Sequence, residues 1–149
     1  MKKIINDREI KTVQYATDYN WYAKIPDSNW LCILVDNDKK RRYVDEVIAK
    51  IINKDVCYVC IIGEGCERTH DLFDEEIVFR EVEIDEYYLP KHHIVTTWHN
   101  EFNEGIKFGI QHAYHDEIEI REVVILDMTD GTERARINKE LAELAYENE

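Results

Sequence analysis

Four short apolar runs, each followed directly by polar side chains, constrain the fold of this chain more than any other feature of its sequence. The runs occupy residues 30–35, 56–62, 94–97 and 123–126. Each is too short for a typical helix and is bounded by turn-forming residues, so we predict that all four are buried strands. Helical patterns follow three of the runs. This alternation is typical of a mainly parallel sheet whose faces are covered by helices.

The expected architecture is therefore a three-layer α/β sandwich with a four-stranded, mainly parallel sheet of the flavodoxin-like or Rossmann-like type. We place the strands in the order second, first, third, fourth, so that the direction of winding changes between the first and third strands. Ligands bind beyond the carboxyl ends of the strands at such a position. Four residues would then border a binding crevice: Asp36, Asp38, His99 and Asn100. Asp127 follows the fourth strand and is a further candidate for binding.

We expect residues 1–149 to form a single domain, because the chain is long enough and, at 44% hydrophobic residues, apolar enough to bury one core. Residues 1–28 are expected to form an irregular or helical flap packed against the sheet. Residues 70–84 fit either a helix or an extended segment, because a helical pattern gives way to an alternating one. The amino terminus has no apolar segment typical of a signal peptide, and no run approaches the ~20 residues of a membrane span.

The four cysteines fit a reducing compartment, in which thiols stay free. Cys32, Cys57 and Cys60 lie within apolar runs, where a free cysteine behaves as a small apolar residue. Cys57 and Cys60 have the spacing of a zinc or redox pair. Residues three apart in a strand face opposite sides of the sheet, so we do not expect the two thiols to act together. We therefore expect a soluble, cytoplasmic protein.

The net charge of −13 narrows the range of partners. Nucleic acid and anionic membranes are disfavoured, because phosphate binding requires clustered Lys and Arg. Ten acidic residues and only two arginines lie between Glu64 and Pro90. This acidic face could attract a basic protein, or it could simply keep the surface solvated. No pattern in the sequence indicates the oligomeric state.

The aspartates that follow the first run could bind a metal ion through paired carboxylates. Residues 34–38 locally resemble response-regulator receiver domains and phosphatases of the haloacid-dehalogenase type. A receiver would carry an aspartate at the end of the third strand, where Thr97 and Trp98 stand here, and the phosphatase pattern lacks its later lysine and acidic pair. The alternative is an ordinary turn in which Asp36 ends the strand and Asp38 caps the next helix.

The loop after the second run combines Cys66, Glu67, His70 and Asp71. If a helix starts near Cys66, its backbone N–H groups would favour the thiolate, with His70 as the base and Asp71 beside it. A metal site formed by Cys66, His70 and His99 is a further possibility. Alternatively, these side chains form local hydrogen bonds and cap the helix.

Trp98 and His99 form a second unusual string at the end of the third run. They could stack on a ligand and exchange a proton with it. They could equally cover the edge of the sheet.

These two strings resemble a family of small uncharacterised bacterial proteins over roughly residues 30–113. The chain is similar to its members in a Gly-x-x-Cys-Glu-x-x-His-Asp string that begins at Gly63. It is also similar in a Thr-Thr-Trp-His string at residues 96–99, followed by Glu101. The family is a domain of unknown function. The resemblance therefore implies that the two strings form one spatial group, but it implies no activity.

Two functions remain open at this stage. The first is a non-catalytic binding or regulatory domain, without a cofactor, whose acidic face or strand-end crevice binds a basic protein or a small ligand. The second is a small hydrolase-like enzyme with a Cys/His or metal site, which requires its side chains to meet in one pocket. The catalytic candidates are Cys66, His70, Asp71 and His99. The binding candidates are Asp36, Asp38, Glu67, Trp98, Asn100 and Asp127.

Overall fold

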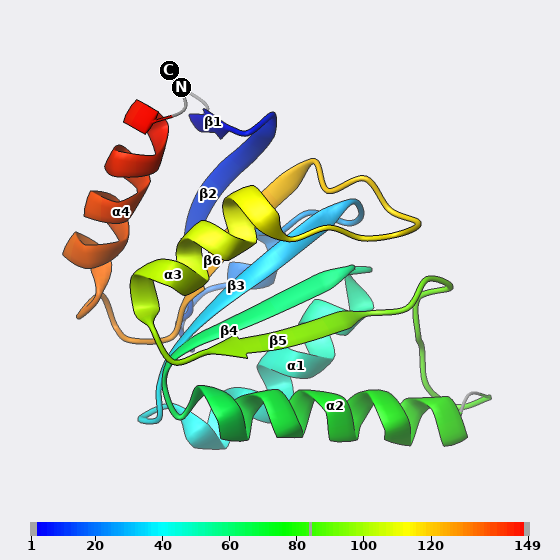
Figure 1. The fold of residues 1–149 in the computed structure, drawn as a ribbon. Coiled ribbons are helices and arrows are strands. Elements are labelled where there is room, and N and C mark those ends of the chain that lie inside the picture. Colours follow the sequence, from blue (N-terminus) through cyan, green and yellow to red (C-terminus); the bar gives the residue numbers. More distant parts are fainter. Residues whose placement is uncertain (1–2, 84, 148–149) are drawn as a thin grey trace.

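One mixed sheet of six strands organises the protein, whose computed structural model describes residues 3–83 and 85–147 (Figure 1). The strands are β1 (Lys3–Ile5), β2 (Arg8–Gln14), β3 (Trp30–Asn37), β4 (Tyr58–Glu64), β5 (Val95–His99) and β6 (Glu122–Asp127). They lie in the order β1-β2-β6-β3-β4-β5. Only β1 and β2 pair in antiparallel fashion, and all other neighbours are parallel.

Helices cover both faces of this sheet (Figure 1). They are α1 (Val44–Asn53), α2 (Cys66–Val82), α3 (Phe102–Lys107) and α4 (Arg134–Glu147). Two 3₁₀ turns (Trp21–Lys24 and Arg41–Tyr43) and a π-helical turn (Phe108–His112) complete the regular structure. One core, here called the α1–α2 core, lies between the sheet and helices α1 and α2. The second, the α3–α4 core, lies on the opposite face. No helix among the described residues is long and apolar enough to cross a membrane.

The α/β class and all four predicted strands are confirmed, but the predicted four-stranded sheet and its strand order are wrong. The sheet has six strands, and β5 lies beside β4 instead of beside β3. The switch point therefore falls between β3 and β6, from which the chain winds in opposite directions. Hydrophobic patterns identify a buried strand, but they do not identify its neighbours, because the pairing depends on packing between distant parts of the chain.

Residues 3–14 add strands to the sheet, in place of the irregular or helical flap that we expected, whereas residues 15–28 are irregular apart from the 3₁₀ turn at Trp21–Lys24. β1 and β2 form a hairpin, and residues 9–14 of β2 pair with β6. Ile10 is buried in the α3–α4 core, whereas Val13 is buried in the α1–α2 core. Their side chains therefore pack against opposite faces of the sheet. An amphipathic helix would instead bury its apolar residues on one side only.

Helix α2 resolves the ambiguous stretch as a helix of 17 residues. Thr69, Phe73 and Arg80 are buried along one side of it, at the spacing of helical turns. Val78 and Val82 are exposed, so the alternation of apolar residues here does not mark a strand. Ile84, the last residue of that alternating pattern, lies outside the described residues.

Two glycines let α3 and the turn that follows it lie close against the sheet. A Cβ atom at Gly105 would stand 2.2 Å from Cγ2 of Ile62, and one at Gly109 would stand 2.7 Å from Cδ1 of Ile33. Contacts this short are repulsive, so a larger residue would push the helix outward. The glycines thereby fix the position of the loop that joins β5 to α3, next to the candidate site.

Candidate functional site

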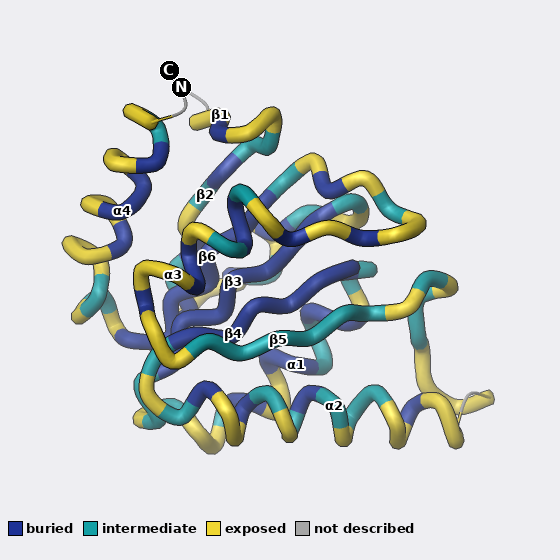
Figure 2. Tube along the Cα trace, viewed as in Figure 1, coloured by how far each residue is buried: buried dark blue, intermediate teal, exposed yellow. Residues whose placement is uncertain are grey.

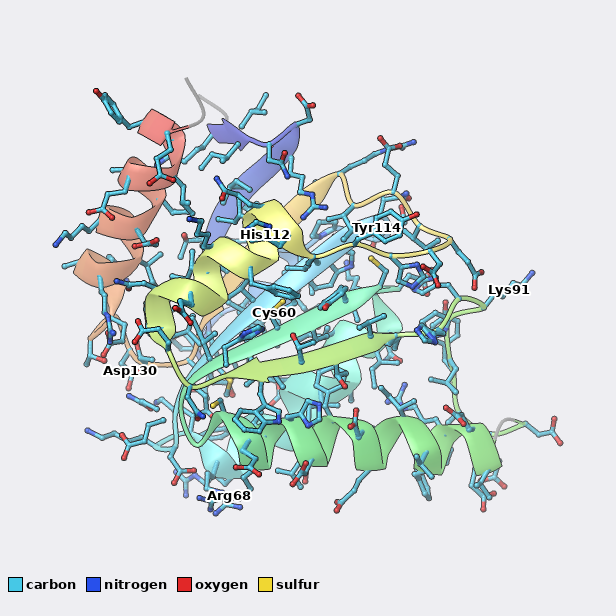
Figure 3. The ribbon with its side chains drawn as sticks, viewed as in Figure 1. Cys60, Arg68, Lys91, His112, Tyr114 and Asp130 are labelled. Atoms are coloured by element: carbon cyan, nitrogen blue, oxygen red, sulfur yellow. The ribbon has the colours of Figure 1, made fainter. Side chains whose placement is uncertain are left out.

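A cavity of about 790 Å³ lies beyond the carboxyl ends of β3, β4 and β5. It is polar, and its walls come from these strand ends and from the first turns of α2, α3 and α4. Figure 3 marks two sides of this region, with Arg68 near the start of α2 and Asp130 in the loop that follows β6. The lining residues are Asp36, Asn37, Gly63, Glu64, Gly65, Cys66, Glu67, Arg68, Asp71, Asn100, Glu101, Phe102, Glu133 and Arg136.

Asp36 is the most deeply buried carboxylate of the cavity, with 2% of its surface exposed. One carboxylate oxygen accepts a hydrogen bond of 2.5 Å from the Thr69 hydroxyl, and the other accepts one of 2.8 Å from the Asp38 backbone N–H. Gly63 allows the backbones of β3 and β4 to approach closely here, because a Cβ atom at this position would lie 2.0 Å from the Asp36 carbonyl oxygen. Its φ of +96° also favours glycine. Asp36 is therefore held rigidly beside the end of β4.

Helix α2 begins at the cavity with its amino-terminal backbone groups uncapped. Its N-cap residue, Gly65, has a φ of 81° and provides no side chain to accept their hydrogen bonds. Asp38 lies beside this turn, and its carboxylate pairs with Arg41 at 3.6 Å and with Arg68 at 3.4 Å. We expected Asp38 to cap the next helix. Instead it adopts a φ of 68°, and α1 begins only at Val44.

The opposite wall combines the start of α4 with the start of α3. The guanidinium of Arg136 lies 3.6 Å from a carboxylate oxygen of Glu133 and stacks over the Phe102 ring, 4.2 Å from its centroid. The carboxylate of Glu101 accepts a hydrogen bond from the Asn103 backbone N–H and so caps α3. Asn100, which we expected to border a binding crevice, is exposed and lines the cavity one residue earlier.

The cavity carries six carboxylates against two guanidinium groups. Both arginines already have a carboxylate within salt-bridge distance. Arg68 pairs with Asp38, and Arg136 pairs with Glu133. Glu64 and Glu67 are exposed, and neither has a hydrogen bond or ion pair within the described part of the chain. The amino terminus of α2 contributes only about half a positive charge. The potential in the cavity is therefore negative.

Cys66 lines the cavity but does not have the surroundings of a reactive thiol. Its side chain is buried, with only 4% exposed, and its Sγ donates a hydrogen bond to the His99 carbonyl oxygen at 3.6 Å. Burial raises the pKa of the Cys66 thiol above its usual value, and the charge of Asp36 acts in the same direction. The thiol is therefore protonated at neutral pH.

His70 and His99 lie on opposite faces of β5 and do not meet. Nε2 of His70 is 3.2 Å from the Thr96 hydroxyl, and its Nδ1 is 3.4 Å from an Asp71 carboxylate oxygen. Nε2 of His99 instead lies 3.1 Å from the Thr97 hydroxyl, on the α3 side. Successive side chains of a strand point to opposite faces, which explains the separation.

His99 also lacks the solvent-exposed surroundings of a general base, because its ring packs against an aromatic side chain. Its ring centroid lies 4.8 Å from that of Phe108, and burial lowers the pKa of His99 despite the nearby charge of Glu104. Among residues 3–83 and 85–147, no group of three or more His, Cys, Asp or Glu side chains is placed to hold a metal ion.

The remaining candidates do not line the cavity. Trp98 is half-buried and packs against the α1–α2 core. Asp127 is buried, and one of its oxygens accepts hydrogen bonds from the Thr129 backbone N–H at 2.7 Å and from its hydroxyl at 2.5 Å. Its other oxygen has no hydrogen-bond partner within the described residues. The structure thus brings five predicted residues to the cavity: Asp36, Cys66, Glu67, Asp71 and Asn100.

Sequence reasoning missed Glu133 and Arg136 because the strand order was wrong. Once β6 lies beside β3, the helix that follows β6 must start near the end of β3. The pair Cys57 and Cys60 is also placed differently from our expectation. Both thiols lie in the α3–α4 core. Cys57 precedes β4, so the alternation of side chains between the two faces of the sheet does not apply to it.

A family described as a domain of unknown function (DUF7684) matches residues 10–144. The chain belongs to this family. The match includes the cavity, strands β3 to β6 and all of β2 except Arg8 and Glu9. No curated protein and no solved structure matches the chain. The family description names no activity.

Proposed function

We propose that this protein is a non-catalytic binding domain whose strand-end cavity holds a cationic group, an amine or a guanidinium, of a small ligand or a basic protein. The excess of carboxylates in the cavity carries the proposal. A concave site lined by one sign of charge concentrates the opposite charge near its walls. Glu64 and Glu67 have no partner of their own among the described residues, so they are available to a bound cation.

The hydrolase-like alternative receives less support from the same geometry. A nucleophilic Cys66 would need a base within hydrogen-bond reach. Its thiol instead points to a backbone carbonyl, and burial keeps its pKa high. The ring nitrogens of His70 lie close to Thr96, Asp71 and Asp74, and no hydrogen bond joins His70 to Cys66 within the described residues.

Agmatine, which carries an amine and a guanidinium, is a suitable probe. We expect it to shift the NMR resonances of Gly65 and Glu67 in the full chain, and the affinity to fall with added salt. The double variant Glu64→Gln and Glu67→Gln should weaken binding by about 1–2 kcal/mol, because two exposed charge interactions are lost. Glu75→Gln is the matched control, because Glu75 is exposed on α2 but does not line the cavity.

Two results would overturn the proposal. The first is the absence of any resonance shift in the wild-type protein. The second is an equal affinity of the double variant and the Glu75→Gln control, because the cavity carboxylates would then not be responsible for binding.

A further inference from the structure

The outer edge of β5 presents backbone groups without a partner. Among the described residues, β5 is the edge strand of the sheet and pairs only with β4. The Val95 N–H donates to the Cys57 carbonyl at 3.1 Å, so alternation directs the backbone groups of Thr97 towards β4 as well. The N–H and C=O groups of Thr96 and Trp98 point away from the sheet. Within the described residues they have no hydrogen-bond partner.

This edge lacks the features that normally prevent strand addition. Proteins protect edge strands with proline, lysine, bulges or a covering segment. The sequence of β5 is Val-Thr-Thr-Trp-His, and all five residues are half-buried. In Figure 1, α2 runs alongside β5 and α3 lies on its other side, and no strand among the described residues pairs with the outer edge of β5. The opposite edge strand, β1, has only three residues and begins at Lys3.

The charges around β5 select the kind of segment that can pair with it. On one face, Asp74 accepts a hydrogen bond of 2.6 Å from the Thr96 hydroxyl. On the other face, the charge of Glu104 acts on His99. An added strand would therefore meet carboxylates on both faces, which favours Lys and Arg side chains. A second copy of this chain would bring the same carboxylates and a net charge of −13, so self-pairing is disfavoured.

We propose that β5 is the docking edge for an extended, basic segment of a partner protein, which adds to the sheet as a further strand. This inference rests on the proposed function, because the basic segment would supply the cationic group that we propose for the cavity. Asn100 and Glu101 follow β5 directly and line the cavity. A strand rises about 3.3 Å per residue, so a basic side chain paired near His99 reaches the cavity within one or two residues.

Amide hydrogen exchange in the full chain tests the docking edge directly. The probe is a ten-residue peptide of alternating Lys and Thr. We expect the Thr96 and Trp98 amides to exchange at least about tenfold more slowly when the peptide is bound, because they gain hydrogen bonds. The Thr97 and His99 amides already belong to the ladder and should change little. A peptide with Glu in place of Lys should protect none of them.

Two substitutions of Thr96 distinguish the contribution of its backbone N–H from that of its side chain. Thr96→Pro removes the outward N–H, and an edge strand tolerates proline where this group faces solvent. Thr96→Val loses the same hydroxyl but keeps the N–H. The peptide should bind the proline variant at least about tenfold more weakly than the valine variant. Equal affinities would overturn the proposal. If the proline variant does not fold, the exchange data on the wild type decide.

The outcomes distinguish this inference from the proposed function. Shifts confined to the cavity, with Thr96 and Trp98 unprotected, would overturn the docking edge and leave the cation site intact. Protection of the edge by the peptide, combined with no binding of agmatine, would overturn the cation site alone. Protection of both amides without peptide, in a protein that sediments as a dimer, would make a second copy the occupant and overturn the proposal.

Discussion

Strands β3 and β5 belong to the same sheet but have opposite surroundings. β3 is paired on both edges and is buried from Trp30 to Asp36, whereas every residue of β5 is half-buried (Figure 2). Within β3, charged side chains occur only where the strand ends. Along β5, threonine and histidine side chains occur within the strand itself. The centre therefore holds the fold together, while the edge and the strand ends present groups that can bind.

Thiol reactivity should show the largest difference between the centre and the strand ends. Burial raises the pKa of Cys60 from 9.0 to about 12, which lowers its thiolate fraction at neutral pH about a thousandfold. We expect iodoacetamide to leave Cys60 and Cys32 unmodified in the folded protein and to modify Cys66 slowly, as followed by mass spectrometry. Unfolded protein, in which all thiols react, is the control. Alkylation of Cys66 at the rate of free cysteine would instead favour the hydrolase-like alternative.

Matched truncations should show a smaller difference in stability. Val59→Ala in β4 empties a fully buried site and should reduce the free energy of unfolding by about 2–3 kcal/mol. Val95→Ala in β5, where the side chain is half-buried, should cost about 1 kcal/mol or less. Urea unfolding with unchanged m-values measures both. Equal losses would mean that the edge is packed as tightly as the centre.

The smallest expected effect is a pH dependence at the edge. Burial lowers the pKa of His99 below 6.5, so the folded protein binds this proton less readily than the unfolded chain. The stabilisation is complete above about pH 6.5 and is lost as the pH falls through the lowered pKa. His99→Asn should reduce this loss by less than about 1 kcal/mol, measured by urea unfolding at about pH 7.5 and 5. An unchanged acid sensitivity in the variant would show that His99 does not contribute.

The contrast between centre and edge also explains how much of the fold the sequence could reveal. The central strands appear as continuous apolar runs because both of their faces are buried. β2 carries Arg8, Glu9 and Lys11 among its apolar residues, so it was not recognised as a strand. The helices of the second half were found because Ile106, Ile110, Ile137 and Leu141 recur at helical spacing and are buried.

The site could be predicted only in part. The rule that ligands bind at the carboxyl ends of strands singled out Asp36 and Asn100, and both line the cavity. Glu133 and Arg136 required the strand order, which depends on contacts between distant segments. Alternation along a strand places Thr96 and His99 on opposite faces, but the sequence does not show that His70 contacts Thr96, so the separation of the two histidines required the structure.

The position of β6 between β2 and β3 has a consequence for folding kinetics. Thr12 pairs with Ile125, and Ile33 pairs with Ile125 from the other side. The hairpin at the beginning of the chain therefore cannot join the sheet until the ribosome has released residues beyond 127. Pairings of such long sequence separation make folding slow. We expect the partly synthesised chain to expose the edges of β2 and β3, and to depend on chaperones until its last strand is inserted.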